Sequence, residues 1–234
     1  MSSLYFGDVF KNADVLLRGL GITFLISVGS LVLGLIIALP VAFMRNSRSG
    51  LLRFPSSLYV EFFRNTPLLA QLFFFFYGLP ELGINTNAIV VAIIAIGLNT
   101  GAYNSEVIRA GLLSVDKGLI DASYALGMSP LQSTVYVVLP NAFRVAFKPL
   151  SSTFINMVLG TSTAASVTAN ELMNSAVVLA GNVFRPFEIY STIFVGYCLL
   201  TFTLSFIAKF ADYHLISKHG KMKNALKSSV GVSG

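Results

Sequence analysis

The chain has 234 residues, of which 55% are hydrophobic and 11% charged, and its mean hydropathy is +0.76. Soluble domains carry about 25% charged residues, so this composition excludes an ordinary soluble domain and predicts an all-α integral membrane protein. The formal net charge of +6 does not predict a nucleic-acid-binding protein, because the basic residues lie between apolar stretches and do not cluster.

The chain begins with an amphipathic segment, residues 1–18, which is typical of a short helix at the external surface of a membrane. Both a lipid anchor and a contact with a partner protein are compatible with it. Residues 19–44 contain no charge and exceed the roughly 20 residues that cross a bilayer, so they predict the first transmembrane helix. Ser30, Gly34 and Ala38 recur at every fourth position and predict a face for close helix packing.

Residues 57–79 predict a second transmembrane helix, with a kink at Pro67. Glu61 and Arg64 are three residues apart, so they predict an ion pair at the membrane interface, with a role in gating as the alternative. The connector that follows contains Glu81 and no basic residue, which predicts that it lies outside the cell.

A third transmembrane helix is predicted within residues 82–105, and it carries Asn99 and Tyr103 near its cytoplasmic end. Polar side chains at this depth either bond to another helix or line a cavity, and both interpretations stay open for Asn99. Glu106 and Arg109 repeat the three-residue spacing and predict a second interfacial pair.

The fourth predicted span, residues 149–169, is rich in hydroxyl groups, which makes it a poor lipid-facing helix and a suitable wall for a polar pathway. Its candidate pathway residues are Asn156, Thr161 and Ser162. Residues 171–186 are apolar enough for a short surface or re-entrant helix on the outside, but do not predict another span.

A fifth span is predicted at residues 189–208, before a basic tail at residues 216–234. Basic loops and tails are expected in the cytoplasm, so the C-terminus is predicted inside and, with five spans, the N-terminus outside. The spans form one predicted transmembrane domain, residues 19–215. The arginines that mark the first cytoplasmic loop are Arg45, Arg48 and Arg53.

The loop between the third and fourth spans predicts two short helices joined by a tight turn. Residues 121–126 suit the first helix, and Gly127 suits the left-handed residue that ends it. Ser129 is a good N-cap and Pro130 fits the first position of the second helix. Pro140 predicts a break or kink before the next span.

This loop, residues 111–140, resembles the cytoplasmic EAA loop of the permease subunits of bacterial ATP-binding-cassette (ABC) importers. The family pattern runs E-A-A, three residues, Gly, nine residues, Ile, any residue, Leu-Pro. The loop residues that the resemblance implies in coupling to the ATPase are Asp121, Ala122, Ser123, Leu126, Gly127, Leu139 and Pro140. Residues 61–78 and 101–111 look like the polar amino acid uptake branch of this family, and the similarity spans about residues 15–215.

The resemblance implies the type I importer fold and a permease subunit in the bacterial inner membrane. It further implies two ATPase subunits that bind ATP and Mg, a second permease subunit, identical or related, and an external binding protein that delivers a polar amino acid. Glu171 matches a glutamate that often follows the fourth helix in relatives, either to meet a substrate ammonium or as an ordinary helix cap or surface residue. Leu159 and Gly160 stand where relatives commonly have a run with lysine, which weakens substrate assignment by analogy.

No enzyme site is evident in the sequence. It lacks a Gly-rich phosphate loop ending in Gly-Lys-Ser/Thr, so this chain is expected to bind no cofactor and to draw its energy from separate chains. Cys198 is the single cysteine, and no metal site is predicted. A secondary transporter or channel for a small polar solute is the alternative, but it would normally show more spans or internal repeats. A structural or assembly protein would not need a hydroxyl-rich helix.

Overall fold

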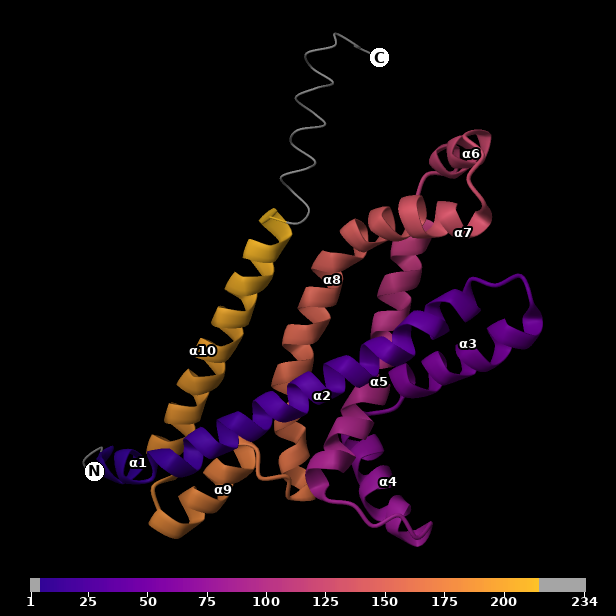
Figure 1. Ribbon diagram of the computed structural model, residues 1–234. Coiled ribbons are helices and arrows are strands. Elements are labelled where there is room, and N and C mark those ends of the chain that lie inside the picture. Colours follow the sequence, from indigo (N-terminus) through magenta and orange to yellow (C-terminus); the bar gives the residue numbers. More distant parts are fainter. Residues whose placement is uncertain (1–4, 215–234) are drawn as a thin grey trace.

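The computed structural model describes residues 5–214, and every regular element within that range is helical (Figure 1). The predicted basic tail, residues 216–234, lies outside the described residues. The elements in chain order are α1 (Gly7–Lys11), α2 (Ala13–Arg45), α3 (Gly50–Asn65), α4 (Leu68–Glu81), α5 (Ala88–Leu113), α6 (Lys117–Ala125), α7 (Pro130–Ser133), the π-helix η1 (Thr134–Val138), α8 (Leu139–Gly160), the 3-10 helix η2 (Thr161–Val167), α9 (Leu172–Val183) and α10 (Pro186–Asp212).

Three of the described helices, α2, α5 and α10, are long and apolar enough to cross a membrane. They overlap the first, third and fifth predicted spans, and α5 extends eight residues beyond the predicted end of the third span at residue 105. In Figure 1, α6 and α7 lie at one end of the molecule, toward which the C-terminal end of α10 also points, and α1 and α9 lie at the opposite end.

The amphipathic N-terminal segment does not form a single helix. α1 ends at Lys11, and α2 begins at Ala13, inside the segment predicted to end at residue 18. Val9 and Leu16 are 6% and 8% exposed, and they pack with buried residues of α9 and α10. Part of the apolar surface of this segment therefore contacts the chain itself, whereas Phe10 and Leu17 are 78% and 65% exposed.

The predicted second span is broken, not kinked. α3 ends at Asn65, and Thr66 and Pro67 are extended, with ψ values of 142° and 135°. The residue before a proline is disfavoured in the helical region, because the proline ring crowds its backbone. The span therefore divides into α3 and α4, and Pro67 occupies the N-cap position of α4 without a side-chain capping hydrogen bond.

Of the break or kink predicted at Pro140, the break is wrong. The chain stays helical from α7 through η1 into α8, and Pro140 is the second residue of α8. A proline ring clashes with the carbonyl four residues earlier in a regular α-helix, and the π-helical turn directly before Pro140 changes that register. The predicted fourth span also changes character at its end, where residues 161–167 form η2.

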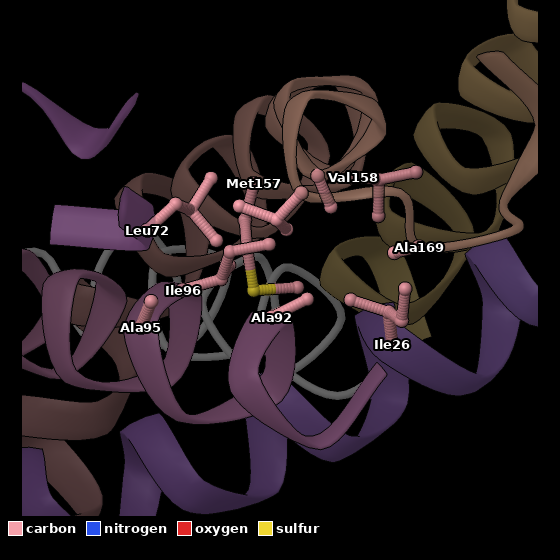
Figure 2. Close-up of a cluster of buried hydrophobic side chains, with 10 residues drawn as sticks. Ile26, Leu72, Ala92, Ala95, Ile96, Met157, Val158 and Ala169 are labelled. Atoms are coloured by element: carbon pink, nitrogen blue, oxygen red, sulfur yellow. The ribbon is translucent and has the colours of Figure 1, made fainter. Parts of the chain in front are cut away.

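Helices α2 and α5 pack closely along the predicted small-residue face. A Cβ on Gly34 would lie 3.2 Å from the Gly97 carbonyl oxygen, and Ser30 and Ala38 are fully buried. The predicted packing face is confirmed. Figure 2 shows the main apolar core, where Ile26, Leu72, Ile96 and Met157 meet from α2, α4, α5 and α8.

Candidate functional site

The α6–α7 hairpin is held by local hydrogen bonds. α6 begins at Lys117, earlier than predicted, because the side chain of Asp116 caps it by accepting a hydrogen bond from the Gly118 amide at 2.6 Å. It ends at Ala125 with Leu126 as its C-cap, and the next residue, Gly127, has φ +81° as predicted. The Gly127 and Met128 amides donate to the carbonyls of Tyr124 and Ser123 at 2.9 and 3.1 Å, which is the Schellman arrangement.

The second half of the hairpin has the predicted cap. Ser129 and Gln132 form a reciprocal capping box, with Pro130 at the start of α7. The hydroxyl groups of Ser123 and Ser133 are buried and lie 2.6 Å apart, so they hydrogen-bond α6 to α7. Sequence reasoning missed Ser133, because nothing in local spacing signals a contact ten residues away.

The outer surface of the hairpin is apolar and uncovered in the single chain. Leu126 is 81% exposed and Leu131 is 74% exposed. Asp121 and Ala122 are also exposed, whereas Ser123 faces inward. A stiff hairpin with a bare apolar surface is well suited to dock on another protein.

Three of the predicted pathway residues meet at one cavity of about 230 Å³, where they add polar groups to a mainly apolar lining. Asn99 and Tyr103 reach it from α5, and Asn156 reaches it from α8. Thr100 and Thr153 add hydroxyl groups that the sequence reasoning did not single out. The full lining is Leu68, Ile96, Asn99, Thr100, Tyr103, Thr153, Asn156, Met157 and Gly160.

Asn99 has both of the roles that the sequence left open, since it hydrogen-bonds to other helices and also lines the cavity. Its Nδ2 donates to the Phe63 carbonyl at 2.9 Å and to Gln71 Oε1 at 3.1 Å, while its side chain also lines the cavity. Gln71 in turn donates to Thr66 Oγ1 at 2.7 Å and is 4% exposed. These amides satisfy carbonyls freed where α3 ends, which is how irregular backbone is tolerated at membrane depth.

Thr161 and Ser162 do not line this cavity. Thr161 is fully buried, and its hydroxyl donates to the Val158 carbonyl at 2.7 Å. Ser162 donates to the Leu159 carbonyl at 2.8 Å. Hydroxyl groups near a helix end commonly bond back to their own backbone, so a hydroxyl-rich sequence does not by itself give a polar wall.

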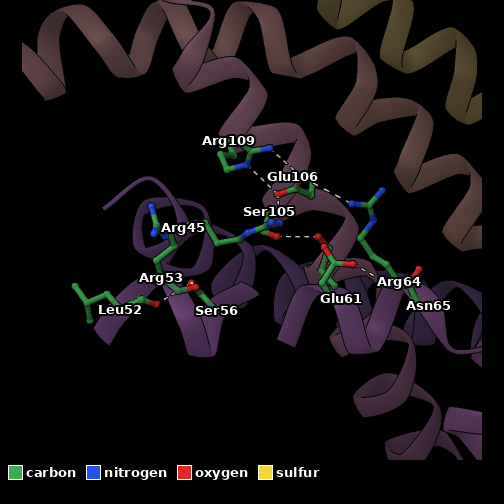
Figure 3. Close-up of polar contacts among 11 residues, drawn as sticks. Arg45, Leu52, Arg53, Ser56, Glu61, Arg64, Asn65, Ser105, Glu106 and Arg109 are labelled. Carbon is green, nitrogen blue, oxygen red and sulfur yellow. Dashed lines mark hydrogen bonds and ion pairs between the residues drawn. The ribbon is translucent and has the colours of Figure 1, made fainter. Parts of the chain in front are cut away.

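Glu106 is the centre of a charged cluster beside the cavity (Figure 3). It forms ion pairs with Arg109 at 3.0 Å, with Arg64 at 3.8 Å and with Arg45, and thereby joins α2, α3 and α5. The predicted Glu106–Arg109 pair is confirmed. Arg64 also lies over the ring of Tyr103, 5.3 Å from its centroid, which connects the cluster to the cavity lining.

The predicted pair between Glu61 and Arg64 is wrong. Glu61 Oε2 accepts a hydrogen bond from Asn65 Nδ2 at 2.9 Å, and Arg64 turns to Glu106 on α5 instead. The pair fails because a carboxylate on a neighbouring helix competes for the same guanidinium group.

Glu171 acts as the N-cap of α9 and is fully buried, so it neither lies on the surface nor faces an external vestibule. Its Oε1 accepts from the Asn174 amide at 2.8 Å, and its Oε2 accepts from Tyr197 at 3.0 Å and Thr23 at 3.4 Å. Burial raises the pKa of the Glu171 carboxyl, and these hydrogen bonds act against that rise. Glu171 thus connects α9 to α2 and α10.

Replacing Glu171 with leucine is expected to lower the free energy of unfolding by about 2–4 kcal/mol, because several buried donors lose their acceptor. Glu171→Gln keeps an acceptor without the charge and is expected to cost less than half as much. The thermal unfolding midpoint of the two purified variants, read by intrinsic tyrosine fluorescence, checks the difference. Equal midpoints for Glu171→Leu and the unmodified chain would show that the cap contributes nothing.

Comparison with known proteins gives consistent matches over most of the chain. Residues 30–219 match the family of binding-protein-dependent transport system inner membrane components. The L-cystine transport system permease protein TcyB of Bacillus subtilis is 39% identical over 194 residues, covering 82% of this chain and 83% of the relative. The glutamine transport system permease protein GlnP of Escherichia coli is 33% identical over 204 residues, covering 86% and 93%. A crystal structure of an amino acid ABC transporter with histidines superposes with a TM-score of 0.84 and 28% identity, covering 91% and 99%.

Proposed function

The chain belongs to the family of binding-protein-dependent transport system inner membrane components, and we propose that the cavity lined by Asn99, Tyr103 and Asn156 is part of the path of a polar amino acid across the bacterial inner membrane. The chain is a permease subunit of an amino acid ABC importer and is not itself an enzyme. The observation that carries the pathway proposal is the meeting of Asn99, Tyr103 and Asn156 at one cavity beside a broken helix.

The proposed topology has five spans, with the N-terminus outside and the C-terminus in the cytoplasm. Helices α2, α5 and α10 are three of them. The pair α3 and α4 forms a fourth, interrupted span, and α8 with η2 forms the fifth. The three arginines predicted to share one loop are divided between the end of α2 (Arg45), the α2–α3 loop (Arg48) and the start of α3 (Arg53), and they favour the cytoplasmic side for this connection. The lysines that follow α10 in the sequence favour the same side for the C-terminus.

The proposed partners are two ATPase subunits that carry ATP and Mg, a second permease subunit, identical or related, and an external solute-binding protein. The exposed leucines of the α6–α7 hairpin, Leu126 and Leu131, support docking on an ATPase. The cavity is open at the surface of the single chain, which supports a second permease subunit as its missing wall.

A continuous helical segment, α7 through η1 into α8, connects the α6–α7 hairpin to the cavity. A displacement of α6 passes through the Ser123–Ser133 hydrogen bond into α7 and along η1 and α8. Asn156 lies on this same continuous, bent helical segment (Figure 1), about 40 Å from Pro130 as measured along the helix at 1.5 Å per residue. A Cβ on Gly111 of α5 would lie 2.7 Å from the Ala142 carbonyl oxygen, so α5 and α8 touch backbone to backbone between hairpin and cavity. That contact is the proposed pivot of alternating access.

A mild-detergent purification of the chain from its native membrane tests the proposal. We expect a co-purifying chain with a phosphate loop, a second permease subunit and an ATPase activity stimulated by the binding protein loaded with one polar amino acid. Purification of the chain alone, with amino acid flux in liposomes without ATP, would support a secondary transporter or channel instead.

Replacing Asn156 with alanine is expected to raise the KM for uptake roughly threefold to tenfold, since one hydrogen bond to the amino acid is lost. Asn156 is chosen because its amide is exposed on the cavity wall. Asn182→Ala, an exposed asparagine on α9 away from the cavity, is the matched control and should leave KM unchanged. Uptake assays in proteoliposomes measure both; an unchanged KM for Asn156→Ala would remove this residue from the pathway.

A further inference from the structure

A second cavity, of about 210 Å³, lies between α8 and α10 and is separate from the one proposed as the pathway; its lining is mainly apolar and carries a group of charged and hydroxyl side chains. It lies near the C-terminal end of α10, which points toward the end of the molecule that holds α6 and α7 (Figure 1). Its lining from α8 is Phe147, Lys148, Ser151, Ser152 and Ile155, and its lining from α10 is Ser205, Ala208, Lys209 and Asp212.

The polar groups of this cavity favour an anion. Within residues 5–214, neither Lys148 nor Lys209 has an ion pair, and the hydroxyl groups of Ser152 and Ser205 have no hydrogen-bond partner. Asp212 contributes one opposing carboxylate, so the two lysines leave a net charge of +1. The cavity therefore presents two ammonium groups and two free hydroxyl donors.

We propose that this cavity binds the headgroup phosphate of an anionic phospholipid of the cytoplasmic leaflet. Basic pockets between transmembrane helices on the cytoplasmic side are suited to lipid phosphates. Lys209 lies in the last turn of the spanning helix α10, which is the depth of the headgroups under the proposed topology.

The surface next to the cavity fits the acyl chains of such a lipid. Only 6% of the most apolar window of α10 is buried in the single chain. Phe202 and Phe206 are each 72% exposed on the spanning part of the helix, toward the membrane interior from Lys209. A phospholipid satisfies the cations and covers an apolar helix at once, whereas a soluble phosphate satisfies the cations alone.

Native mass spectrometry of the full chain, purified with its co-purifying partners and titrated with dioleoylphosphatidylglycerol, tests the proposal. Each lysine near an anionic surface contributes about a fivefold factor in affinity, so Lys148→Gln/Lys209→Gln is expected to weaken the tightest lipid site roughly 25-fold. Arg48→Gln/Arg53→Gln is the matched control, because it removes two exposed cations, one from the α2–α3 loop and one from the start of α3, and should leave that site unchanged.

Three outcomes would overturn the proposal. The first is equal phosphatidylglycerol affinity in the lysine double variant and the control. The second is displacement of the lipid by glycerol 1-phosphate at equal concentration, which would identify a soluble phosphate as the ligand. The third is loss of a permease subunit from the lysine variant, which would identify a subunit interface. Should that variant fail to fold, Ser152→Ala/Ser205→Ala keeps both charges and is expected to weaken the lipid site about fivefold; no weakening would count against it.

Discussion

Replacing Gly127 with valine is expected to reduce amino acid uptake about tenfold or more while leaving membrane insertion intact. Gly127 has φ +81°, a conformation that costs an L-residue about 1–2 kcal/mol and a β-branched residue more. Each 1.4 kcal/mol is a factor of ten in the population of the native turn. The variant should therefore lose the turn that sets the angle between α6 and α7, and with it the proposed coupling to the ATPase.

The prediction separates backbone strain from steric clash, because a Cβ at Gly127 would meet nothing within 4 Å. Gly83 offers a matched control: it has φ +77°, also with open space around it, in the α4–α5 connector. Gly83→Val should carry similar strain without uncoupling. Gly127→Asn should retain most uptake, because asparagine tolerates the left-handed region.

ATPase co-purification, ATP hydrolysis and uptake of the three variants are to be measured together. The coupling assignment requires that Gly127→Val lose uptake in one of two ways. Either the ATPase no longer co-purifies, or ATP is still hydrolysed without uptake. Normal uptake by Gly127→Val, or an equal loss in Gly83→Val, would contradict it.

Local chemistry explains which parts of the hairpin were predictable. The left-handed Gly127 and the Ser129–Pro130 start of α7 depend on residues that are adjacent in sequence, and the structure has both. α6 starts at Lys117, before the predicted start at Asp121, because the Asp116 side chain caps the helix there. The Ser123–Ser133 contact depends on the angle between two helices, which the sequence pattern does not give.

The errors at membrane depth share a physical cause. An apolar run in the sequence predicts a stretch buried in lipid, but it does not show whether the helix is interrupted. The helix is interrupted between α3 and α4, and polar side chains satisfy the carbonyls that the interruption leaves free. Here Gln71 and Asn99 do so for the carbonyl of Phe63. A spacing of three residues predicts that two side chains are neighbours on one helix. It does not show that Arg64 pairs with the carboxylate of Glu106 on α5. Three-dimensional contacts decide both features.

Replacing Glu106 with glutamine is expected to lower the unfolding midpoint of the transporter by about 5–10 °C, which corresponds to roughly 2–3 kcal/mol. The substitution leaves Arg45, Arg64 and Arg109 without the carboxylate that all three contact. Glu106 is 21% exposed, so water screens part of the repulsion and the cost is at the lower end for a buried ion pair. Arg64 contributes least, since it is the most exposed and the most distant.

Glu106→Gln is also expected to lower the uptake rate, because Glu106 lies about one helical turn after Tyr103, which lines the cavity. Without the carboxylate, the ends of α2 and α3 are no longer held to α5, and the wall that carries Asn99 and Tyr103 shifts against α8. Glu61→Gln is the matched control, because this glutamate forms no ion pair within residues 5–214 and only accepts from Asn65. Thermal midpoints and uptake rates of the two variants, measured side by side, decide the issue. If Glu61→Gln and Glu106→Gln lose equal stability and uptake, the loss is not specific to Glu106. Only a selective loss in Glu106→Gln shows that its carboxylate holds α2, α3 and α5 together.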